Sequence, residues 1–283
     1  MAKVFRKQNH LNINGSLYSI EDPVVMGILN ITPDSFFDGG KFFSPDNALA
    51  RVTAMVEEGA DIVDVGAWSS RPGSKLISEQ EELNRLLPVL EEIRLTHPDV
   101  VLSVDTFRSG VARKVVNEFN VNIINDISAG NMDSNMFETI AELQVPYIMM
   151  HMKGTPETMQ VEPFYENLFR EIVKYFSERV DKLRILGVND IILDPGFGFG
   201  KTLEHNFELL ARLDEFKVFE LPVLAGLSRK SMIYRTIEST QEHSLEGTVA
   251  ANIIALQNGA DILRVHDVKA AKECIRIYVN THS

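Results

Sequence analysis

The sequence predicts an α/β fold in which eight parallel strands close into a (β/α)8 barrel, the TIM-barrel architecture. Eight short apolar runs follow one another, each separated from the next by a stretch long enough for one crossover helix. Such runs of Val, Ile and Leu are typical of parallel strands buried on both faces. An open, doubly wound sheet shares this alternation, but eight units favour the closed barrel. The runs are 24–29, 62–63, 100–104, 121–124, 146–150, 191–193, 222–226 and 262–265.

Helix signals occupy the intervals between the runs. Ser44, followed by proline, predicts an N-cap, and Gly59 predicts the end of that helix. Ser78 and Glu81 have the spacing of a capping box that begins another helix. A long helical period fills 163–187 and again ends at a glycine. These helices would form the outer ring of the barrel.

A short repeated sequence occurs at the turns from helix to strand. Gly-Ala-Asp-Ile occurs at 59–62 and again at 259–262, with a looser copy at 187–191. In each copy the glycine stops a helix and the next strand begins within a few residues. The repeated sequence therefore supports a repeated βα unit.

The N-terminal residues lie outside the repeat. The stretch 12–20 alternates in polarity around Asn14-Gly15, a strong signal for a β-hairpin. We expect this hairpin to cover the bottom of the barrel. No Pro/Gly/Ser-rich linker interrupts the chain, so 1–283 is predicted to form a single domain.

The composition excludes several classes of protein. The chain is 45% hydrophobic and 24% charged, with a net charge of −12, which argues against a nucleic-acid partner. No apolar stretch is long enough to span a membrane, and no apolar segment follows the basic N-terminus as in a signal peptide. The single cysteine, Cys274, is expected to be a packing residue, which suits a cytoplasmic protein.

Polar residues stand at or just past the carboxyl ends of the apolar runs. Asp64, Asp105, Asn125 and Asp194 would converge at the barrel mouth, where TIM-barrel active sites lie. Carboxylates beside an amide can bind a flat heterocycle that carries both hydrogen-bond donors and acceptors. Any one of these aspartates could instead cap the following helix. Four together favour a ligand site.

Cations gather after the last three strands. Lys201, Arg229, Lys230, Arg264 and His266 fall at neighbouring strand ends of an acidic protein, which indicates a pocket for a small anion. Barrels often place a phosphate site after strands seven and eight.

Several loops look functional. The glycine-rich segment 194–202 has neither Walker A nor Rossmann spacing, and we expect it to hold Phe197 and Phe199 over the mouth. The long stretches 30–40 and 68–73 are predicted lids. His151 lacks a second ligand at metal-binding spacing, so it is expected to be a core or wall residue.

These loops, in this order, resemble the dihydropteroate synthase family, and the match runs from Val24 to Asp267. The motifs that carry the resemblance are Met-Gly-Ile-Leu-Asn at 26–30 through Gly40, Arg-Pro-Gly at 71–73, Ser-Val-Asp-Thr at 103–106, Ile-Asn-Asp-Ile-Ser at 124–128, Met-His-Met at 150–152, Gly-Thr-Pro at 154–156, the segment 194–201, His-Asn at 205–206, Ser-Arg-Lys-Ser at 228–231 and Arg-Val-His-Asp at 264–267.

The resemblance implies an enzyme of folate biosynthesis, a target of sulfonamides. It would condense 6-hydroxymethyl-7,8-dihydropterin pyrophosphate with 4-aminobenzoate, giving 7,8-dihydropteroate and pyrophosphate. By the same resemblance Asp105, Asn125, Asp194 and Lys230 would meet the edges of the pterin, and Arg264 its face. The pyrophosphate would be held by Asn30, Arg264, His266 and a Mg²⁺ ion, with Asn30 as the protein ligand of the metal.

The resemblance also assigns the chemistry. Asp34, Asp105 and Asp194 would stabilise a cation formed by early C–O cleavage, with Lys230 as a further catalytic residue. The aminobenzoate would pack near Phe197 and the stem of Lys230. Its other neighbours would be Ser70, Arg71, Pro72 and Ser231. A homodimer through the outer helices is implied as well.

The chain departs from the family in the second loop. The family usually has Gly-Glu-Ser-Thr before Arg-Pro-Gly, whereas this chain has Ala-Trp-Ser-Ser at 67–70. Phe37 also replaces a small polar residue. Two alternatives stay open: a methyltetrahydrofolate-binding methyltransferase domain, which would have no use for Lys230, Arg264 and His266 around a diphosphate, and a paralogue that binds pterins without turnover.

Overall fold

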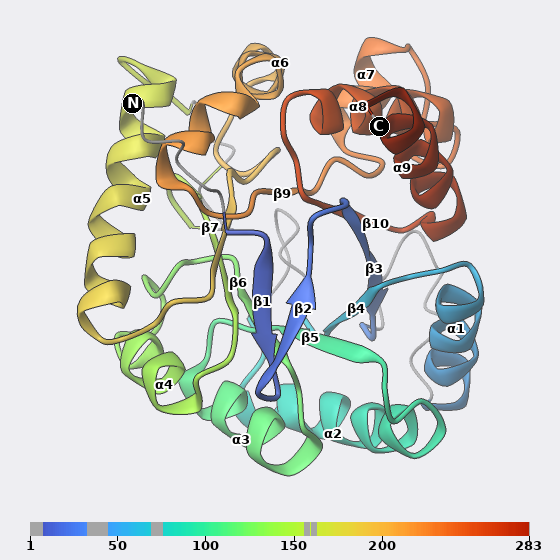
Figure 1. The fold of residues 1–283 in the computed structure, drawn as a ribbon, viewed down its shortest axis with the longest axis vertical. Coiled ribbons are helices and arrows are strands. Elements are labelled where there is room, and N and C mark those ends of the chain that lie inside the picture. The colour runs from blue at the N-terminus through green and yellow to red at the C-terminus, as the bar shows by residue number, and fades with distance from the viewer. Residues whose placement is uncertain (1–7, 33–44, 69–75, 156–158, 160–162, 283) are drawn as a thin grey trace.

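A computed structural model describes residues 8–32, 45–68, 76–155, 159 and 163–282, and it has the predicted barrel (Figure 1). The strands pair in the order β8-β7-β6-β5-β4-β3-β10-β9, and a parallel bridge between Leu193 and Val223 joins the two ends. The prediction of a (β/α)8 barrel is therefore confirmed. The strands are β3 (Val24–Asn30), β4 (Ile62–Gly66), β5 (Val101–Asp105), β6 (Ile123–Asp126), β7 (Tyr147–Met150), β8 (Ile191–Asp194), β9 (Leu224–Ala225) and β10 (Ile262–Val265).

Helices surround the barrel as an outer ring (Figure 1). They are α1 (Pro45–Glu57), α2 (Glu79–Thr96), α3 (Ser109–Phe119), α4 (Met136–Leu143), α5 (Leu168–Ile185), α6 (Leu203–Ala211), the 3-10 helix η1 (Leu213–Phe219), α7 (Ser231–Thr236), α8 (Leu245–Gln257) and α9 (Val268–His282). Within the described ranges, none has the length and apolar character needed to cross a bilayer.

The helix starts follow the side chains that cap them. Ser78 Oγ accepts a hydrogen bond from Glu81 N at 3.2 Å, which is one half of the predicted capping box, while the Glu81 carboxylate accepts from Arg85 Nε at 2.9 Å. Helix α5 begins at Leu168 and not near residue 163, because the Asn167 side chain accepts from Arg170 N at 2.9 Å and fixes the N-cap there. Ser44 lies outside the described residues.

The repeated Gly-Ala-Asp-Ile sequence performs the same task in both copies. Its two glycines have φ values of 96° and 89°, a conformation that side chains disfavour. Asp61 Oδ2 accepts from Val25 N at 2.7 Å, and Asp261 Oδ2 accepts from Val223 N at 2.7 Å. Each aspartate thus fixes the start of a neighbouring strand.

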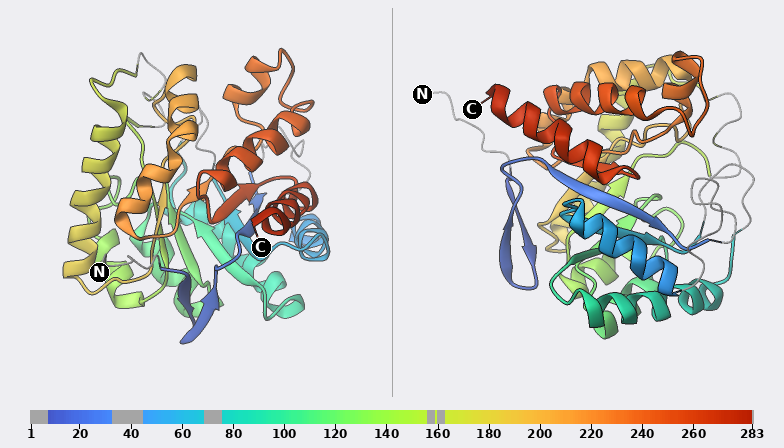
Figure 2. Two further views of the ribbon diagram at one scale, coloured as in Figure 1. Left: turned by 45° about the horizontal axis from the view of Figure 1, so that its top comes forward. Right: turned by 90° about the vertical axis from the view of Figure 1, so that its right-hand side faces the viewer.

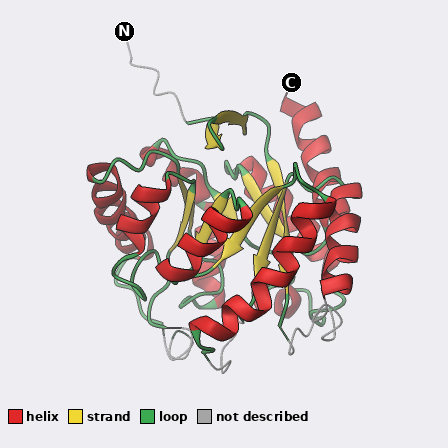
Figure 3. Cartoon of the chain, turned by 90° about the horizontal axis from the view of Figure 1, so that it is seen from below, coloured by secondary structure: helices red, strands yellow, loops and turns green. Residues whose placement is uncertain are grey.

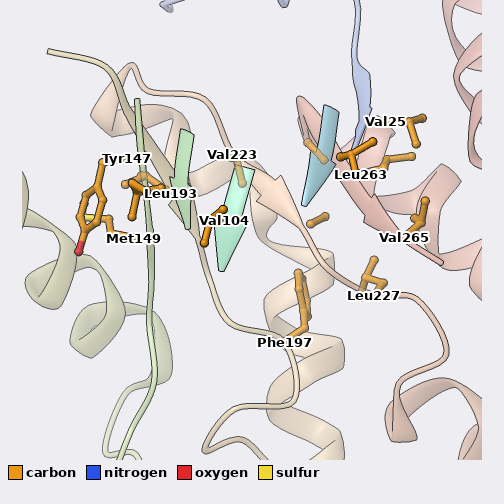
Figure 4. Packing of buried hydrophobic residues seen from close by; sticks show 14 of the residues in the cluster. Val25, Val104, Tyr147, Met149, Leu193, Phe197, Val223, Leu227, Leu263 and Val265 are labelled. Carbon is orange, nitrogen blue, oxygen red and sulfur yellow. The ribbon is translucent and has the colours of Figure 1, made fainter. Parts of the chain in front are cut away.

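The predicted hairpin is present and closes one end of the barrel. Strands β1 (His10–Ile13) and β2 (Ser16–Ser19) join at Asn14 and Gly15, and they lie where the barrel strands begin (Figures 2 and 3). Leu11 is buried in the lower interior layer, whose members also include Met26, Ile62, Ile123, Ile148, Ile192, Leu224 and Ile262. A larger apolar cluster fills the space between strands and helices (Figure 4). The opposite end, where the strands finish, remains available for a site.

Candidate active site

Acidic and basic side chains meet at the end of the barrel where the strands finish. They line one cavity of about 1020 Å³. Its predicted members include Asn30, Asp105, Asn125, Asp194, Phe197, Lys230, Ser231, Arg264 and His266. The strand-end pattern in the sequence therefore located the cavity correctly, and the volume is large enough for a small-molecule ligand.

Arg264 is the centre of the acidic side. Its Nε donates to Asp64 Oδ2 at 2.7 Å, and its Nη2 lies 3.1 Å from Asp105 Oδ2. Asn125 Nδ2 also donates to Asp64 Oδ2, at 3.0 Å. Asp64 is 0% exposed, so these donors take the place of water around its carboxylate. The network joins strands β4, β5, β6 and β10 and fixes the guanidinium inside the barrel.

Asp105 is poised to change its charge near neutral pH. Burial raises its pKa to about 7, against the lowering effect of the Arg264 guanidinium. The neighbouring Asp64 carboxylate raises the pKa further. A carboxyl group with such a pKa can be protonated or ionised in the cavity, depending on the ligand beside it.

Lys230 and Asp194 form the other polar edge of the cavity. Burial lowers the pKa of Lys230 to about 8, while the Asp194 carboxylate opposes that shift. Burial raises the pKa of Asp194, and Lys230 is the main group that lowers it. Lys230 Nζ donates to the Phe197 carbonyl and lies 4.9 Å from the centre of the Phe199 ring. The ammonium group is thus held at the mouth.

His266 and Asn30 lie at neighbouring strand ends. The His266 Nδ1 is 3.0 Å from Ser228 Oγ, which orients the imidazole. Asn30 ends β3, and its Oδ1 lies 3.5 Å from the place where a Cβ on Gly66 would stand. That Cβ would also lie 3.5 Å from Asp105 Cβ. The absence of a side chain at Gly66 therefore lets Asn30 and Asp105 approach each other.

Comparison with known proteins shows which family the chain belongs to. The pterin binding enzyme family matches residues 26–266. Dihydropteroate synthase of Haemophilus influenzae is 43% identical over 273 residues, which cover 96% of this chain and 98% of the relative. The chain belongs to the dihydropteroate synthase family. The Escherichia coli member is 44% identical over 95% of both chains.

Solved structures of the family share the fold. The dihydropteroate synthase of Yersinia pestis, in complex with a sulfonamide drug, has a TM-score of 0.92 and 41% identity, and the match covers 96% of this chain and 99% of that one. The enzyme of Xanthomonas albilineans with 4-aminobenzoic acid has a TM-score of 0.88 and 36% identity, covering 97% and 98% of the two chains.

Two of the cations that line the cavity, Lys201 and Arg229, also support its loops. Lys201 is buried, and its Nζ donates to Gly196 O at 2.9 Å, to Phe199 O at 3.0 Å and to His151 Nδ1 at 3.0 Å. Arg229 forms a bidentate pair with Asp267, with both distances at 2.8 Å. All five cations of the sequence cluster thus line the cavity, and Lys201 and Arg229 hold its loops as well. His151 is buried, as expected of a core or wall residue.

The expectation that Phe197 extends over the mouth is wrong. Its side chain is 0% exposed and belongs to the large apolar cluster, where Figure 4 shows it with Leu227 and Val265. Glycines on both sides of it have positive φ, so the loop turns this ring inward. Phe199, which approaches Lys230, is the ring nearer the ligand side. Asp34, Phe37, Ser70, Arg71 and Pro72 lie outside the described residues.

An apolar wall on the acidic side was not predicted. Trp68, Ile127, Met150 and Met159 line the cavity and belong to one cluster with Phe107. Most of these residues follow strand ends, and their apolar side chains give no pattern that separates a ligand wall from a core. Across the described residues, no group of three or more His, Cys, Asp or Glu side chains converges as a metal site.

Proposed function

We propose that the chain is a dihydropteroate synthase that condenses 6-hydroxymethyl-7,8-dihydropterin pyrophosphate with 4-aminobenzoate. One observation carries the proposal: Arg264, held by Asp64 and Asp105, shares a single cavity with Lys230 and His266. A flat nitrogenous ring can bind to Arg264 and its carboxylate partners, and the leaving diphosphate can bind to the cations Lys230 and His266. Both substrates would then lie at the mouth of one barrel.

The pterin would bind between polar edges and a charged face. Asp105, Asn125 and Asp194 would accept from its amino and ring N–H groups, while Lys230 would donate to an acceptor on the ring. The guanidinium of Arg264, fixed in the barrel interior by two carboxylates, would lie against the ring face. These roles need no movement of the strand ends.

The diphosphate would be held by Asn30, Arg264 and His266 together with Mg²⁺. The Asn30 amide oxygen is a hard donor that lines the cavity beside Gly66, which fits a divalent cation whose remaining ligands are water and diphosphate oxygens. When bound, this ion would neutralise negative charge that develops on the leaving diphosphate. We expect it to be needed for turnover.

The reaction would begin with cleavage of the C–O bond. Its electron pair leaves with the pyrophosphate, and the ring delocalises the positive charge left on the methylene carbon. Asp105 and Asp194 would stabilise that cation from the cavity wall, joined by Asp34 of the first loop. The lone pair of the aniline nitrogen then forms the C–N bond, and the nitrogen loses a proton to water, so no strong base is needed.

The aminobenzoate would occupy the outer part of the cavity. Its ring would pack near the Lys230 stem and the Phe197 segment, with Ser231 at the start of α7 on one side. The second loop would supply Ser70, Arg71 and Pro72. The Phe197 side chain is fully buried, so the aminobenzoate ring would contact the main chain of Phe197 and not its ring. The carbonyl group of this main chain accepts the hydrogen bond from Lys230 Nζ.

The test is a coupled assay of pyrophosphate release. Release should require dihydropterin pyrophosphate, 4-aminobenzoate and Mg²⁺ together. Asp105→Asn should lower turnover far more than it weakens retention of pyrophosphate. Tight binding of dihydropterin pyrophosphate with no release on adding 4-aminobenzoate would overturn the proposal and favour a paralogue without turnover.

We also propose a cytoplasmic, single-domain enzyme that forms a homodimer through its outer helices. Ile254 on α8 and Ile277 on α9 are 43% and 63% exposed, and the two helices pack side by side. These exposed apolar side chains suit contact with a second copy. Sedimentation should give the mass of two chains.

A further inference from the structure

The apolar wall of the cavity is built around the only tryptophan of the chain. Trp68 is 6% exposed, and its ring meets Phe107 edge to face, with centroids 5.3 Å apart and an angle of 81°. The same cluster contains Ile127 and Met150. Trp68, Phe107 and Ile127 follow β4, β5 and β6, and Met150 ends β7. The wall therefore stands on the side of the mouth that carries Asp105 and Asn125.

A buried ion pair supports the wall from behind. Arg108 lies over the Phe107 ring, 4.4 Å from its centre, and pairs with Glu82 of α2. Glu82 is 0% exposed, and one of its oxygens has no hydrogen-bond partner among the described residues. The same helix reaches the residue before Trp68, since Arg85 Nη1 donates to Ala67 O at 3.1 Å. Helix α2 therefore fixes the chain on both sides of the aromatic pair.

We propose that Trp68 is a specificity-determining residue for the heterocyclic substrate, and that Glu82 and Arg108 are positioning residues that hold it through Phe107. This inference rests on the proposed function and deepens it. The indole closes the cavity beside Asp105 and Asn125, where the pterin edge binds. The proposed aminobenzoate site is beside Lys230 and Ser231, which follow β9 on the other side of the barrel.

Two physical effects support the assignment. An indole presents a large, rigid apolar surface to a flat ring, and aromatic pairs gain energy beyond the area that they bury. An apolar surface beside the pterin edge also lowers the local dielectric, which strengthens the hydrogen bonds that the ring makes there. A carboxylate or a small side chain at position 68 would provide neither effect.

The first test separates the two substrates. Trp68→Ala should raise the KM for dihydropterin pyrophosphate about tenfold or more and leave the KM for 4-aminobenzoate within about twofold. Trp68→Phe keeps an aromatic ring and should recover most of the loss. An unchanged pterin KM in an active Trp68→Ala enzyme, or a larger effect on 4-aminobenzoate, would overturn the inference without touching the proposed activity.

The second test uses the fluorescence of Trp68 itself. Because the chain has one tryptophan, every change in the wavelength of indole emission reports on this site. Dihydropterin pyrophosphate alone should shift the emission maximum, and 4-aminobenzoate alone should leave it in place. The reverse pattern would assign Trp68 to the other substrate.

The third test addresses the positioning pair. Arg108→Met should raise the pterin KM about fivefold and move the Trp68 emission to longer wavelength, with Arg108→Lys recovering part of both. Breaking a buried pair can unfold a protein, so the double variant Glu82→Met with Arg108→Met removes both charges and should stay folded while showing the same defects. Leu95→Ala, exposed on the same helix, is the control. A lower melting temperature with an unchanged pterin KM and an unchanged Trp68 emission would show that Glu82 and Arg108 have only a structural role.

Discussion

Asp64→Asn tests the network that fixes Arg264. Asp64 Oδ2 receives Arg264 Nε at 2.7 Å and Asn125 Nδ2 at 3.0 Å. An amide oxygen can face the same donors, so the substitution keeps the shape and removes the charge. The amide NH2 would then stand at the position of Oδ1, which has no hydrogen-bond partner among the described residues. The variant therefore removes one of the two carboxylates that pair with Arg264 and leaves a buried donor without an acceptor.

The expected cost follows from these two losses. Breaking a buried pair costs about 3 to 5 kcal/mol, and an unsatisfied buried donor costs about 1 to 3 kcal/mol. Arg264 keeps Asp105 as a partner at 3.1 Å, so we expect the low end of both costs together, about 4 kcal/mol. For a chain of 283 residues that loss corresponds to a melting temperature about 7 °C lower.

The same substitution should move the pH profile. Asp64 is one of the groups that raise the Asp105 pKa, which stands at about 7. Removing that negative charge lowers the Asp105 pKa, so the carboxylate forms at lower pH. If the ionised form is the active one, the acidic limb of kcat/KM shifts to lower pH in Asp64→Asn.

The assays are thermal unfolding and kcat/KM between about pH 5.5 and pH 8.5. Asp214→Asn, at an exposed position on η1, serves as the control and should change neither measurement. An Asp64→Asn enzyme with unchanged melting temperature and an unmoved acidic limb would refute the reasoning, because Arg264 would then not depend on Asp64.

Three further predictions follow from single contacts. Lys230→Ala should lower kcat/KM by at least about 100-fold, and it should remove a basic limb near the Lys230 pKa of about 8, seen as a flat profile up to pH 9. Gly196→Ala should cost more than about 3 kcal/mol in a denaturant titration, since a Cβ would lie 2.0 Å from the His151 carbonyl oxygen at φ +71°. Asn30→Ala should raise the Mg²⁺ concentration needed for half-maximal pyrophosphate release about tenfold, with an unchanged melting temperature; an equal Mg²⁺ requirement would remove Asn30 from the diphosphate site.

Much of the site was predictable because parallel strands each leave two signals in the sequence, an apolar run and a polar residue at the end of that run. Their apolar runs show burial on both faces, and the residue that ends each run must then stand at the rim. That logic placed Asp105, Asn125, Asp194 and Arg264 in one cavity before any contact was known. It misplaced Asp64, which is the third residue of β4 and not its end, and which lies buried behind the residues that line the cavity. Its partner, Arg264, lies 200 positions away in sequence.

The spacing of residues in the sequence does not encode which partners a side chain contacts. Lys201 and Arg229 line the cavity as predicted, but Lys201 also donates to backbone carbonyls and Arg229 also pairs with Asp267. Arg229 has a φ of 55°, a conformation that no residue pattern announces for an arginine. Phe197 turns inward for a related reason, since the glycines around it permit a loop that reverses its ring. For Arg229 and Phe197 the backbone conformation therefore decides where the side chain lies.

The position of Arg264 explains why one barrel can serve both halves of the substrate. Its Nε and Nη2 are directed at Asp64 and Asp105, so the guanidinium cannot follow the diphosphate when it leaves. A planar group fixed on two sides offers its face to a ring and its remaining edge to an anion, which a lysine at this position could not do. The two buried carboxylates cost stability compared with apolar residues, but they orient one cation before any substrate arrives. That preorganisation is what a reaction with early charge separation requires of its site.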